Sequence, residues 1–452
     1  MGEEEEMREK RSMSRRQFVS AASGAVLAGA AAGTARRAAA GQAPKLAIDG
    51  GPKTVTSAPA AQPRWGQTER KQLESMLQQR SLFYWQGGGY GPQSSLLIER
   101  YRRFYPAKWV HTCSSGTAAI HIAVAAAGIG WGDEVITAPV TDMGTVIGLI
   151  YQQAVPVFAD LGEGTYNLDP ADVQRRITPK TKAIIAVHLA GNPCDMDALK
   201  AIAEKHKLVL IEDCCQAWGA KYRGRPIGSV GHFACHSFQN SKHVTCGDGG
   251  VVATNDERFG PLLQKFGDKG NSRLSATSFD GFATNYRMSE PQAAVAAAQL
   301  TRLEAIAAKR NRLGDLLTEN IADVPGIIPH DVHPEDRCVY WFYMFRIRPE
   351  AFRCNRSRFV HALAAEGARV VGGYIKYPLY KEPVFQNHGF FAGRWPVKDF
   401  GDTDMDFTKH SCPEAEKILV TNIRVPIYEY MTEEYILQVA QAIRKVALHY
   451  AV

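Results

Sequence analysis

The sequence predicts an α/β protein whose larger lobe contains a mostly parallel sheet covered by helices on both faces. Between residues 135 and 254, short apolar runs alternate with helix-like stretches, a pattern typical of parallel sheets. Several of these runs lack the polar–apolar alternation of a strand with one wet face, so we expect them to be buried on both faces. After a break near residue 325, a strand-like run and an amphipathic helix indicate a smaller α+β lobe.

The elements of the larger lobe can be placed in order along the chain. The expected strands are Val135–Val140, Val155–Asp160, Ala183–Leu189, Leu208–Asp213, Phe233–Phe238 and Val251–Thr254. Helices are expected at Ile120–Ala127 and Pro193–His206, and a long one with few breakers runs from Gln292 to about Asn320. Val324-Pro325-Gly326 ends this helix, because proline and glycine both interrupt helices.

The chain is expected to divide into three parts. Residues 1–43 form an export signal and flexible N-terminus, residues 44–325 the large lobe with an N-terminal arm, and residues 326–452 the small lobe. Within the small lobe, Val339–Ile347 is strand-like, and Thr432–His449 has the apolar stripe of a helix that packs on a core.

The first part has the pattern of an export signal. Ser14-Arg15-Arg16-Gln17-Phe18-Val19 precedes an uncharged run rich in alanine and glycine, Ala21–Ala32, and Ala38-Ala39-Ala40 follows. As a helix this run would be about 18 Å long, too short to span a bilayer core of about 30 Å. Paired arginines before such a run resemble a twin-arginine signal, which exports folded proteins. We therefore expect a periplasmic or other extracytoplasmic location; the alternative is a disordered basic tail on a cytoplasmic protein.

Composition and charge exclude several classes of protein. Hydrophobic residues make up 45% of the chain and charged residues 22%, which excludes a disordered, collagen-like or multispan membrane protein. After residue 43 the chain has 46 basic and 41 acidic residues without a basic block, so nucleic-acid binding is not expected. Nine cysteines, an odd number without a repeating spacing, do not indicate a disulfide framework.

Motifs of several common chemistries are absent. There is no Gly-x-x-x-x-Gly-Lys-Ser/Thr loop, no Gly-x-Gly-x-x-Gly in the first βα unit, no His-Glu-x-x-His and no Gly-x-Ser-x-Gly. His232 and His236 lie four residues apart on an expected strand without a completing carboxylate, so we interpret them as structural and expect no metal site. The adjacent Cys214 and Cys215 would point different ways, which favours buried, inert thiols over a redox pair.

One candidate binding feature is a helix start rich in small and hydroxyl residues. Ser114-Ser115-Gly116-Thr117-Ala118-Ala119 leads into the expected helix Ile120–Ala127. Free N–H groups and the positive end of the helix dipole at such a start attract an anion such as a phosphate. Plain N-capping by serine would explain the same residues.

A second feature is a carboxylate at the carboxyl end of a buried strand. Leu208-Val-Leu-Ile-Glu-Asp213 ends at the sheet edge where open α/β sheets bind ligands. There Asp213 could pair with a pyridinium nitrogen and keep that nitrogen protonated, which strengthens the ring as an electron sink. Helix capping is the structural alternative.

The third feature is a lysine that leaves another buried strand. Ser237-Phe-Gln-Asn-Ser-Lys242 is followed by Gly247-Asp-Gly-Gly250 and a further strand. A buried lysine near positive groups loses its proton more easily and can then attack an aldehyde to form a Schiff base. A lone lysine near glycines is usually a surface residue, but the three features in this order on one sheet supply a phosphate cradle, a pyridinium partner and an imine-forming amine. Together they predict pyridoxal 5′-phosphate as cofactor.

These residues resemble the DegT/StrS family of sugar aminotransferases that depend on pyridoxal phosphate. The likeness extends from about Leu46 to the C-terminus. The similar segments are Leu46–Gly51, Ser114–Thr117, Gly132–Ile136, Val187–Leu189, Glu212–Gln216, Ser237–Lys242 with Gly249-Gly250, and Asn285–Ser289.

The resemblance implies a transferase of fold type I and a homodimer whose active sites lie at the subunit interface. It implies that Lys242 forms the Schiff base, that Asp213 pairs with the pyridine nitrogen, and that Gln216 pairs with the ring hydroxyl oxygen. The residues implied to hold the phosphate are Gly116, Thr117, Ser237 and, across the interface, Asn285.

The sequence departs from the family pattern in two respects. Family members usually have an aromatic residue that stacks on the cofactor ring at the position of Asp142, within Pro139-Val-Thr-Asp142-Met143-Gly144. A carboxylate there is expected to change the preference for donor or substrate. Export is also unusual, since the nucleotide-linked sugars that the family commonly uses are cytosolic.

The function that these observations predict is transamination. An amino-acid donor such as glutamate or glutamine would give its nitrogen to a keto-sugar or keto-cyclitol, with Lys242 as general acid and base. The alternatives are a sugar dehydratase of the same fold, a branch of the family that has histidine in place of the lysine, and a non-catalytic binding protein. The aromatic-rich segment 373–380 either lines the sugar side of the site or packs within the small lobe.

Overall fold

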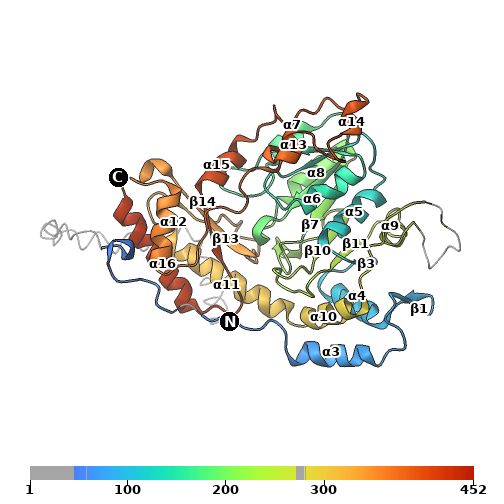
Figure 1. Cartoon of the computed structure of the whole chain (residues 1–452), viewed down its shortest axis with the longest axis horizontal. Coiled ribbons are helices and arrows are strands. Elements are labelled where there is room, and N and C mark those ends of the chain that lie inside the picture. Colours follow the sequence, from blue (N-terminus) through green and yellow to red (C-terminus); the bar gives the residue numbers. More distant parts are fainter. Residues whose placement is uncertain (1–44, 58, 271–278, 280) are drawn as a thin grey trace, which may run out of the picture. The chain divides into compact units, whose positions relative to one another are not determined.

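A seven-stranded sheet forms the centre of the larger lobe in the computed structural model, which describes residues 45–57, 59–270, 279 and 281–452 (Figure 1). Its strand order is β3-β11-β10-β7-β6-β4-β5, and only β11 runs antiparallel to its neighbours. The strands are β3 (Trp109–Cys113), β4 (Glu134–Thr137), β5 (Val155–Phe158), β6 (Thr181–Val187), β7 (Val209–Asp213), β10 (Phe233–Ser237) and β11 (Gly250–Thr254). The predicted α/β class with a mostly parallel sheet is confirmed.

Helices cover both faces of this sheet. The alternating side chains of β11 show the division: Val252 belongs to the core cluster that contains α5, whereas Val251 and Ala253 belong to the cluster that contains α4 and α10. The helices of the large lobe are α3 (Gln67–Leu77), α4 (Pro92–Phe104), α5 (Gly116–Ala126), α6 (Gly144–Tyr151), α7 (Pro170–Arg176), α8 (Met196–His206), α9 (Leu262–Gly267) and α10 (Glu290–Leu300). Burial on both faces explains why the central strands are apolar without alternation.

Six strands were predicted and all six are present, each within three residues of its expected bounds at either end. The edge strand β3 was not predicted, because its buried His111 and Thr112 interrupt the apolar run. Tyr84 compensates for their polarity, since its hydroxyl donates to Thr112 O and accepts from Thr112 Oγ1.

The long helix expected from Gln292 to about Asn320 is wrong in one respect: it is two helices, α10 and α11 (Leu303–Ile321). Thr301 ends α10, and its hydroxyl donates to Ala298 O at 2.7 Å. Arg302 is drawn toward Glu69 and donates to the backbone O of Arg64. These contacts of Arg302 with Arg64 and with Glu69 of α3 stabilise the break, which residue propensities alone do not signal.

The small lobe contains a three-stranded antiparallel sheet backed by helices. Its strands are β12 (Ile327–Ile328), β13 (Phe342–Ile347) and β14 (Asn422–Pro426) in that order, and α12 (Arg356–Ala365) and α16 (Glu433–Tyr450) pack near them. Helix α11 contributes to the same core, as do Leu46 and Val55 of the arm. Residues Leu46–Val452 form one compact unit, and the lobe boundary at residue 325 remains a prediction.

Short elements complete the described chain. They are β1 (Trp85–Gln86), β2 (Gly89–Tyr90), β8 (Lys221–Tyr222), β9 (Arg225–Pro226), α13 (Pro383–Gln386), α14 (Pro396–Asp399), α15 (Pro413–Thr421) and the 3₁₀ turns η3 (Ala47–Asp49), η4 (Leu189–Gly191), η5 (Pro349–Ala351) and η6 (Leu379–Lys381). None of the helices among the described residues is long and apolar enough to cross a membrane. The predicted export signal lies outside the described residues.

Candidate active site

A cavity of about 310 Å³ lies at the carboxyl edge of the sheet, where the strands β7 and β10 end. Six of the seven residues predicted for the site line it: Gly116, Thr117, Asp213, Gln216, Ser237 and Lys242. Further lining residues come from the loop after β4 and the start of α6, from the turn after β7, from the lysine loop and from the small lobe: Asp142, Gly144, Thr145, Cys215, Gln239, Ser241, Asp248 and Trp341. The structure therefore brings the three sequence features together.

The start of α5 forms one wall of the cavity. Ser115 is the N-cap, and its hydroxyl accepts from the N–H of Ala118 at 3.0 Å. The N–H groups of Gly116 and Thr117 belong to the first turn, which has no intrahelical partners for them. A Cβ at position 116 would lie 2.7 Å from both Cys215 Sγ and Ser237 Cβ, so only glycine keeps this wall open. The N-cap by Ser115 therefore leaves the N–H groups of Gly116 and Thr117 available to an anion.

Asp213 lies at the end of β7, only 5% exposed, and is held by two hydrogen bonds. Its Oδ2 accepts from the hydroxyl of Thr145 at 2.8 Å, and its Oδ1 accepts from the N–H of Cys215 at 3.1 Å. A carboxylate has about four acceptor positions, so two remain for a ligand. Burial raises the pKa of the Cys215 thiol, which keeps this neighbour neutral.

Lys242 lies in the loop between β10 and β11 with 7% of its surface exposed. Its Nζ is 3.6 Å from the centre of the Trp341 ring. Burial lowers the pKa of Lys242, and the negative charges of Asp213 and Asp142 oppose that effect. A lowered pKa increases the fraction of the neutral, nucleophilic amine at a given pH.

Gln216 connects the cavity to both lobes. Its Oε1 accepts from the N–H of Ala190 at 2.9 Å, and its Nε2 donates to the hydroxyl of Tyr374 at 3.2 Å. Tyr374 also packs against Phe342, with ring centroids 5.0 Å apart. The segment 373–380 therefore supplies one contact at the site, while its Tyr380 is buried in the core.

Asp142 stands in the cavity wall where the family pattern has an aromatic residue. Its Oδ1 accepts from the N–H of Gly144 at 2.8 Å, and its side chain is exposed to the cavity. Lys242 Nζ instead lies over the ring of Trp341, the residue before β13 in the small lobe.

Asn285 does not line the cavity of its own chain. It is exposed, its Oδ1 accepts from the N–H of Arg287 at 3.3 Å, and its backbone pairs with Asp268. Its predicted contact with phosphate therefore requires a second subunit and remains a prediction.

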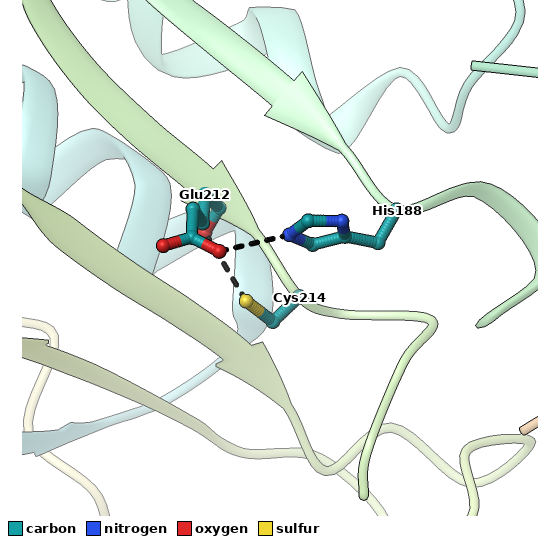
Figure 2. Close-up of side chains that lie close together, drawn as sticks. All are labelled: His188, Glu212 and Cys214. Carbon is teal, nitrogen blue, oxygen red and sulfur yellow. Dashed lines mark hydrogen bonds and ion pairs between the residues drawn. The ribbon is translucent and has the colours of Figure 1, made fainter. Parts of the chain in front are cut away.

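A second polar cluster lies on the opposite face of the end of β7. Figure 2 shows His188, Glu212 and Cys214 side by side, all buried and with the arrangement of a possible metal site. The ligand atoms are already used. Glu212 accepts from the N–H groups of Gly228, Val230 and Gly231 and from His188 Nε2.

The other ring nitrogen of His188 is also engaged. His188 Nδ1 accepts from the N–H of Cys194 at 3.1 Å, so neither nitrogen of the neutral ring has a lone pair left for a cation. Burial alone would raise the pKa of Glu212, but the hydrogen bonds from His188 and the backbone hold it below its ordinary value. We interpret the cluster as a structural network.

The histidines and cysteines weighed from the sequence have structural contacts. His232 Nδ1 accepts from the N–H of Leu210, and His236 Nδ1 lies 3.2 Å from the hydroxyl of Tyr101. All nine cysteines fall in the described part of the chain, and none is paired there. Burial raises the pKa of the Cys214 thiol as it does that of Cys215.

Two residues that line the cavity beside the predicted ones, Thr145 and Trp341, were not singled out from the sequence. Thr145 has a weak signal, since it comes shortly after an expected strand and is the second residue of a helix that begins with Gly144. Trp341 has no local signal, because it comes from the small lobe, about one hundred residues from the lysine loop that it meets. Tyr374 lies in the aromatic-rich segment 373–380, for which the sequence left open both a place at the site and packing within the small lobe, and its hydroxyl accepts from Gln216.

The cavity fits pyridoxal 5′-phosphate in chemistry and size. The first-turn N–H groups of α5 with the hydroxyls of Thr117 and Ser237 suit a phosphate, Asp213 with two unused acceptor positions suits a protonated ring nitrogen, and the Lys242 amine suits an aldehyde. A volume of about 310 Å³ lies within the range of small-molecule sites.

Comparison with known proteins agrees with this fit. Residues 69–444 match the model of the DegT/DnrJ/EryC1/StrS aminotransferase family. A putative L-glutamine:3-amino-2,3-dideoxy-scyllo-inosose aminotransferase of Micromonospora echinospora is 34% identical over 359 residues, 78% of this chain and 84% of that protein. The GDP-perosamine synthase of Caulobacter vibrioides is 38% identical over 275 residues, 60% of this chain and 73% of that protein.

Solved structures show the same fold. An aminotransferase from Psychrobacter cryohalolentis is similar with a TM-score of 0.75 at 29% identity, covering 85% of this chain and 98% of that one. The structure of 3-amino-5-hydroxybenzoic acid synthase is similar with a TM-score of 0.74 at 26% identity, covering 86% and 99%. The resemblance seen in the sequence is confirmed: the chain belongs to the DegT/DnrJ/EryC1/StrS aminotransferase family.

Proposed function

We propose that the protein is a pyridoxal phosphate-dependent aminotransferase that moves an amino group from glutamate or glutamine to a keto-sugar or keto-cyclitol. The observation that carries the proposal is the meeting of Lys242, Asp213 and the start of α5 in one cavity. Family membership supports the reaction class, and the names of two relatives, one with a glutamine donor and a scyllo-inosose derivative, support the substrate classes.

Each residue has a role that follows from its contacts. The start of α5 and Ser237 would hold the phosphate, and Asp213 would keep a proton on the pyridine nitrogen because Thr145 fixes its orientation. When bound, the cofactor supplies an electron-withdrawing ring that makes the carbon–hydrogen bond beside the substrate nitrogen acidic. Gln216, held between Ala190 and Tyr374, would meet the ring hydroxyl.

Lys242 moves the proton. With a pKa lowered by burial, its Nζ can accept a proton from the substrate carbon and return it to another carbon. The Trp341 ring, with its centre 3.6 Å from Nζ, limits where the amine can lie and shields it from water.

Lys242→Ala tests the mechanism directly. We expect amino transfer to be lost while the fold is retained, and borohydride treatment of the wild type with cofactor to mark the peptide that contains Lys242, as read by mass spectrometry. The exposed Lys182→Ala is the control and should behave as wild type. An undiminished rate in Lys242→Ala would contradict the proposal.

The acceptor can be identified by a spectroscopic screen. Glutamate and glutamine as donors should be crossed with keto-sugars and keto-cyclitols, free and nucleotide-linked, with product nitrogen measured by mass spectrometry. Asp142 adds a carboxylate to the cavity, which favours neutral polyhydroxy acceptors over acidic ones. A deoxygenated product without nitrogen would instead indicate dehydratase chemistry, and binding without turnover a non-catalytic protein.

We also propose a homodimer with shared sites. Asn285 is exposed and outside its own cavity, and an open groove of about 720 Å³ beside the lysine loop is lined by residues such as Trp65, which is 51% exposed. When Lys242→Ala and Asn285→Ala chains are co-expressed, each mixed dimer should contain one intact site, with Lys242 from one chain and Asn285 from the other. Part of the activity should therefore return. Light scattering that gives a monomer at working concentration would contradict the dimer.

Export by a twin-arginine-type signal remains part of the proposal. Replacing Arg15 and Arg16 by lysine should retain the protein in the cytoplasm, as measured by fractionation, and N-terminal sequencing of the exported form should begin near Ala40. A wild-type protein found intact in the cytoplasm would overturn this part and leave the transaminase proposal untouched.

A further inference from the structure

The loop that carries Lys242 has four successive backbone carbonyl groups with no partner in a strand or helix. They belong to residues 240–243, between the end of β10 and the start of β11. Lys242 and His243 are buried, and a buried carbonyl without a hydrogen bond costs free energy, so this part of the loop needs donors from elsewhere in the fold. Side chains from two distant segments supply all of these donors.

Arg64, in the N-terminal arm, binds three of the four carbonyls. Its Nη1 donates to Asn240 O at 2.6 Å, and its Nη2 donates to Lys242 O and to His243 O, the latter at 2.6 Å. The fourth carbonyl, that of Ser241, accepts from Trp341 Nε1 at 2.8 Å. Thus Trp341 holds the loop through its ring nitrogen and faces the lysine amine with its ring.

Arg64 is itself held through its side chain and through its backbone. Its Nε lies 3.6 Å from a Glu429 carboxylate oxygen, and the backbone O of Arg64 accepts from Gln299 Nε2 and Arg302 Nη2, both at 2.8 Å. Glu429 is anchored in turn by the fully buried Arg310, at 2.7 and 2.9 Å. The arm residue is therefore part of a rigid network that joins α10, α11 and the segment after β14.

We propose that Arg64 is a positioning residue for Lys242: by binding the carbonyls on both sides of the lysine it fixes the backbone from which the amine reaches the cofactor. Only a planar guanidinium offers several donors in one fixed fork, whereas a lysine at position 64 could bind one or two carbonyls without the same geometry. Arg64 binds backbone oxygens of the loop and is not among the residues that line the cavity, so its effect on the reaction is indirect.

This inference rests on the proposed role of Lys242, and its test uses a measurement besides turnover. The apoprotein is mixed with pyridoxal phosphate, quenched with borohydride at timed intervals, and the modified Lys242 peptide is quantified by mass spectrometry. The variants are Arg64→Met and Arg64→Lys. The matched control is Arg337→Met, because Arg337 also binds a backbone carbonyl, Gly219 O, and an acid, Glu304, but does not line the cavity.

Arg64→Met is expected to slow modification of Lys242 and to lower kcat, each by roughly 100-fold, since displacing a reacting group by about 1 Å has an effect of this size. The KM of the donor should stay within about threefold, because no binding contact is removed. Arg64→Lys should fall between Arg64→Met and wild type, and Arg337→Met should lie within about twofold of wild type in both measurements.

Modification and kcat within about twofold of wild type in both Arg64 variants would overturn the inference. If circular dichroism shows that Arg64→Met does not fold, Arg64→Lys decides in the same way. A slow modification shared equally by Arg337→Met would also overturn it, since the effect would then be general loss of rigidity. Failure to modify Lys242 in the wild type would instead overturn the proposed function together with this inference.

Discussion

The two carboxylates at the end of β7 are adjacent in the chain but differ in how many hydrogen bonds the protein gives them. Glu212 points away from the cavity, and it receives four hydrogen bonds, one from His188 and three from backbone N–H groups. Asp213 points to the cavity and receives two, from Thr145 and from the N–H of Cys215. Both are buried, so burial alone does not distinguish a structural from a functional acid.

What distinguishes them is the number of acceptor positions that the protein leaves unused. Glu212 has none left for a cation or substrate, although it lies within a cluster with the ligand types of a metal site (Figure 2). Asp213 is oriented by the protein and still has two positions free. The comparison predicts that changes at Glu212 act on stability and that changes at Asp213 act on the reaction.

Among the variants that test this comparison, Asp213→Asn is expected to lower kcat the most. An amide cannot hold a positive charge on a ring nitrogen, so kcat should fall by about 10²–10³-fold, the usual effect of removing one group that stabilises developing charge. Thermal unfolding of the apoprotein should change little. The measurement is steady-state kinetics paired with a melting curve; a loss of stability matching that of Glu212→Gln would erase the distinction between the two acids.

Glu212→Gln is expected to lower the free energy of unfolding by about 3–5 kcal/mol, as when one partner of a buried charged network is removed. Denaturant titration of the apoprotein measures this. The fraction that folds should still modify Lys242 with cofactor at the wild-type rate. A folded but inactive variant would show that Glu212 serves the reaction after all.

The same variant tests the pH dependence of stability. Because the pKa of Glu212 lies below its ordinary value of 4.5 in the folded state, its contribution to stability is complete above that pH and is lost as the pH falls through the lowered pKa. The wild type should therefore lose stability in acid more steeply than Glu212→Gln. The measurement is denaturant titration at several values from about pH 3 to about pH 6, a range set by these pKa values. If the free energy of unfolding fell equally with pH in wild type and Glu212→Gln, Glu212 would not be the source of the acid sensitivity.

Gly116→Ala examines the cavity wall opposite Asp213. The added Cβ would meet Cys215 Sγ and Ser237 Cβ at 2.7 Å, so the start of α5 must shift, with an expected cost of about 1–3 kcal/mol. This cost should appear as weaker cofactor binding in equilibrium dialysis. The control is Gly130→Ala, which has open space for a Cβ and should bind the cofactor as wild type does. Gly128→Ala is less suitable, because the positive φ of Gly128 would strain an alanine.

The smallest effect is expected from Thr145→Val, which removes the hydroxyl that orients Asp213 and keeps the shape of the side chain. Loss of one hydrogen bond to a charged group corresponds to about 1.5 kcal/mol, or roughly tenfold in kcat. The double variant with Asp213→Asn should be no slower than Asp213→Asn alone. If the losses in kcat of the two single variants instead added up in the double variant, Thr145 would act independently of Asp213.

Sequence reasoning worked where one local pattern determines the structure. The apolar runs marked six strands because both faces of each strand are buried, and Asp213 and Lys242 were found because each follows such a run. Contacts between distant segments had no such signal. Trp341 reaches the site from the small lobe and Arg64 from the arm, and the break between α10 and α11 depends on Arg302 meeting Glu69.

The antiparallel course of β11 has a consequence for how this enzyme can diversify. Because β10 and β11 are neighbours of opposite direction, the segment 238–249 leaves and re-enters the sheet at the same edge. A replacement of this segment, lysine included, would leave the order of the strands unchanged, but it would have to preserve the carbonyl groups that Arg64 and Trp341 bind. The segment also carries Gln239, Ser241 and Asp248 of the cavity lining, so a change of the catalytic lysine and a change of part of the cavity wall come together. Asp213 and the start of α5 lie outside the segment and would be retained.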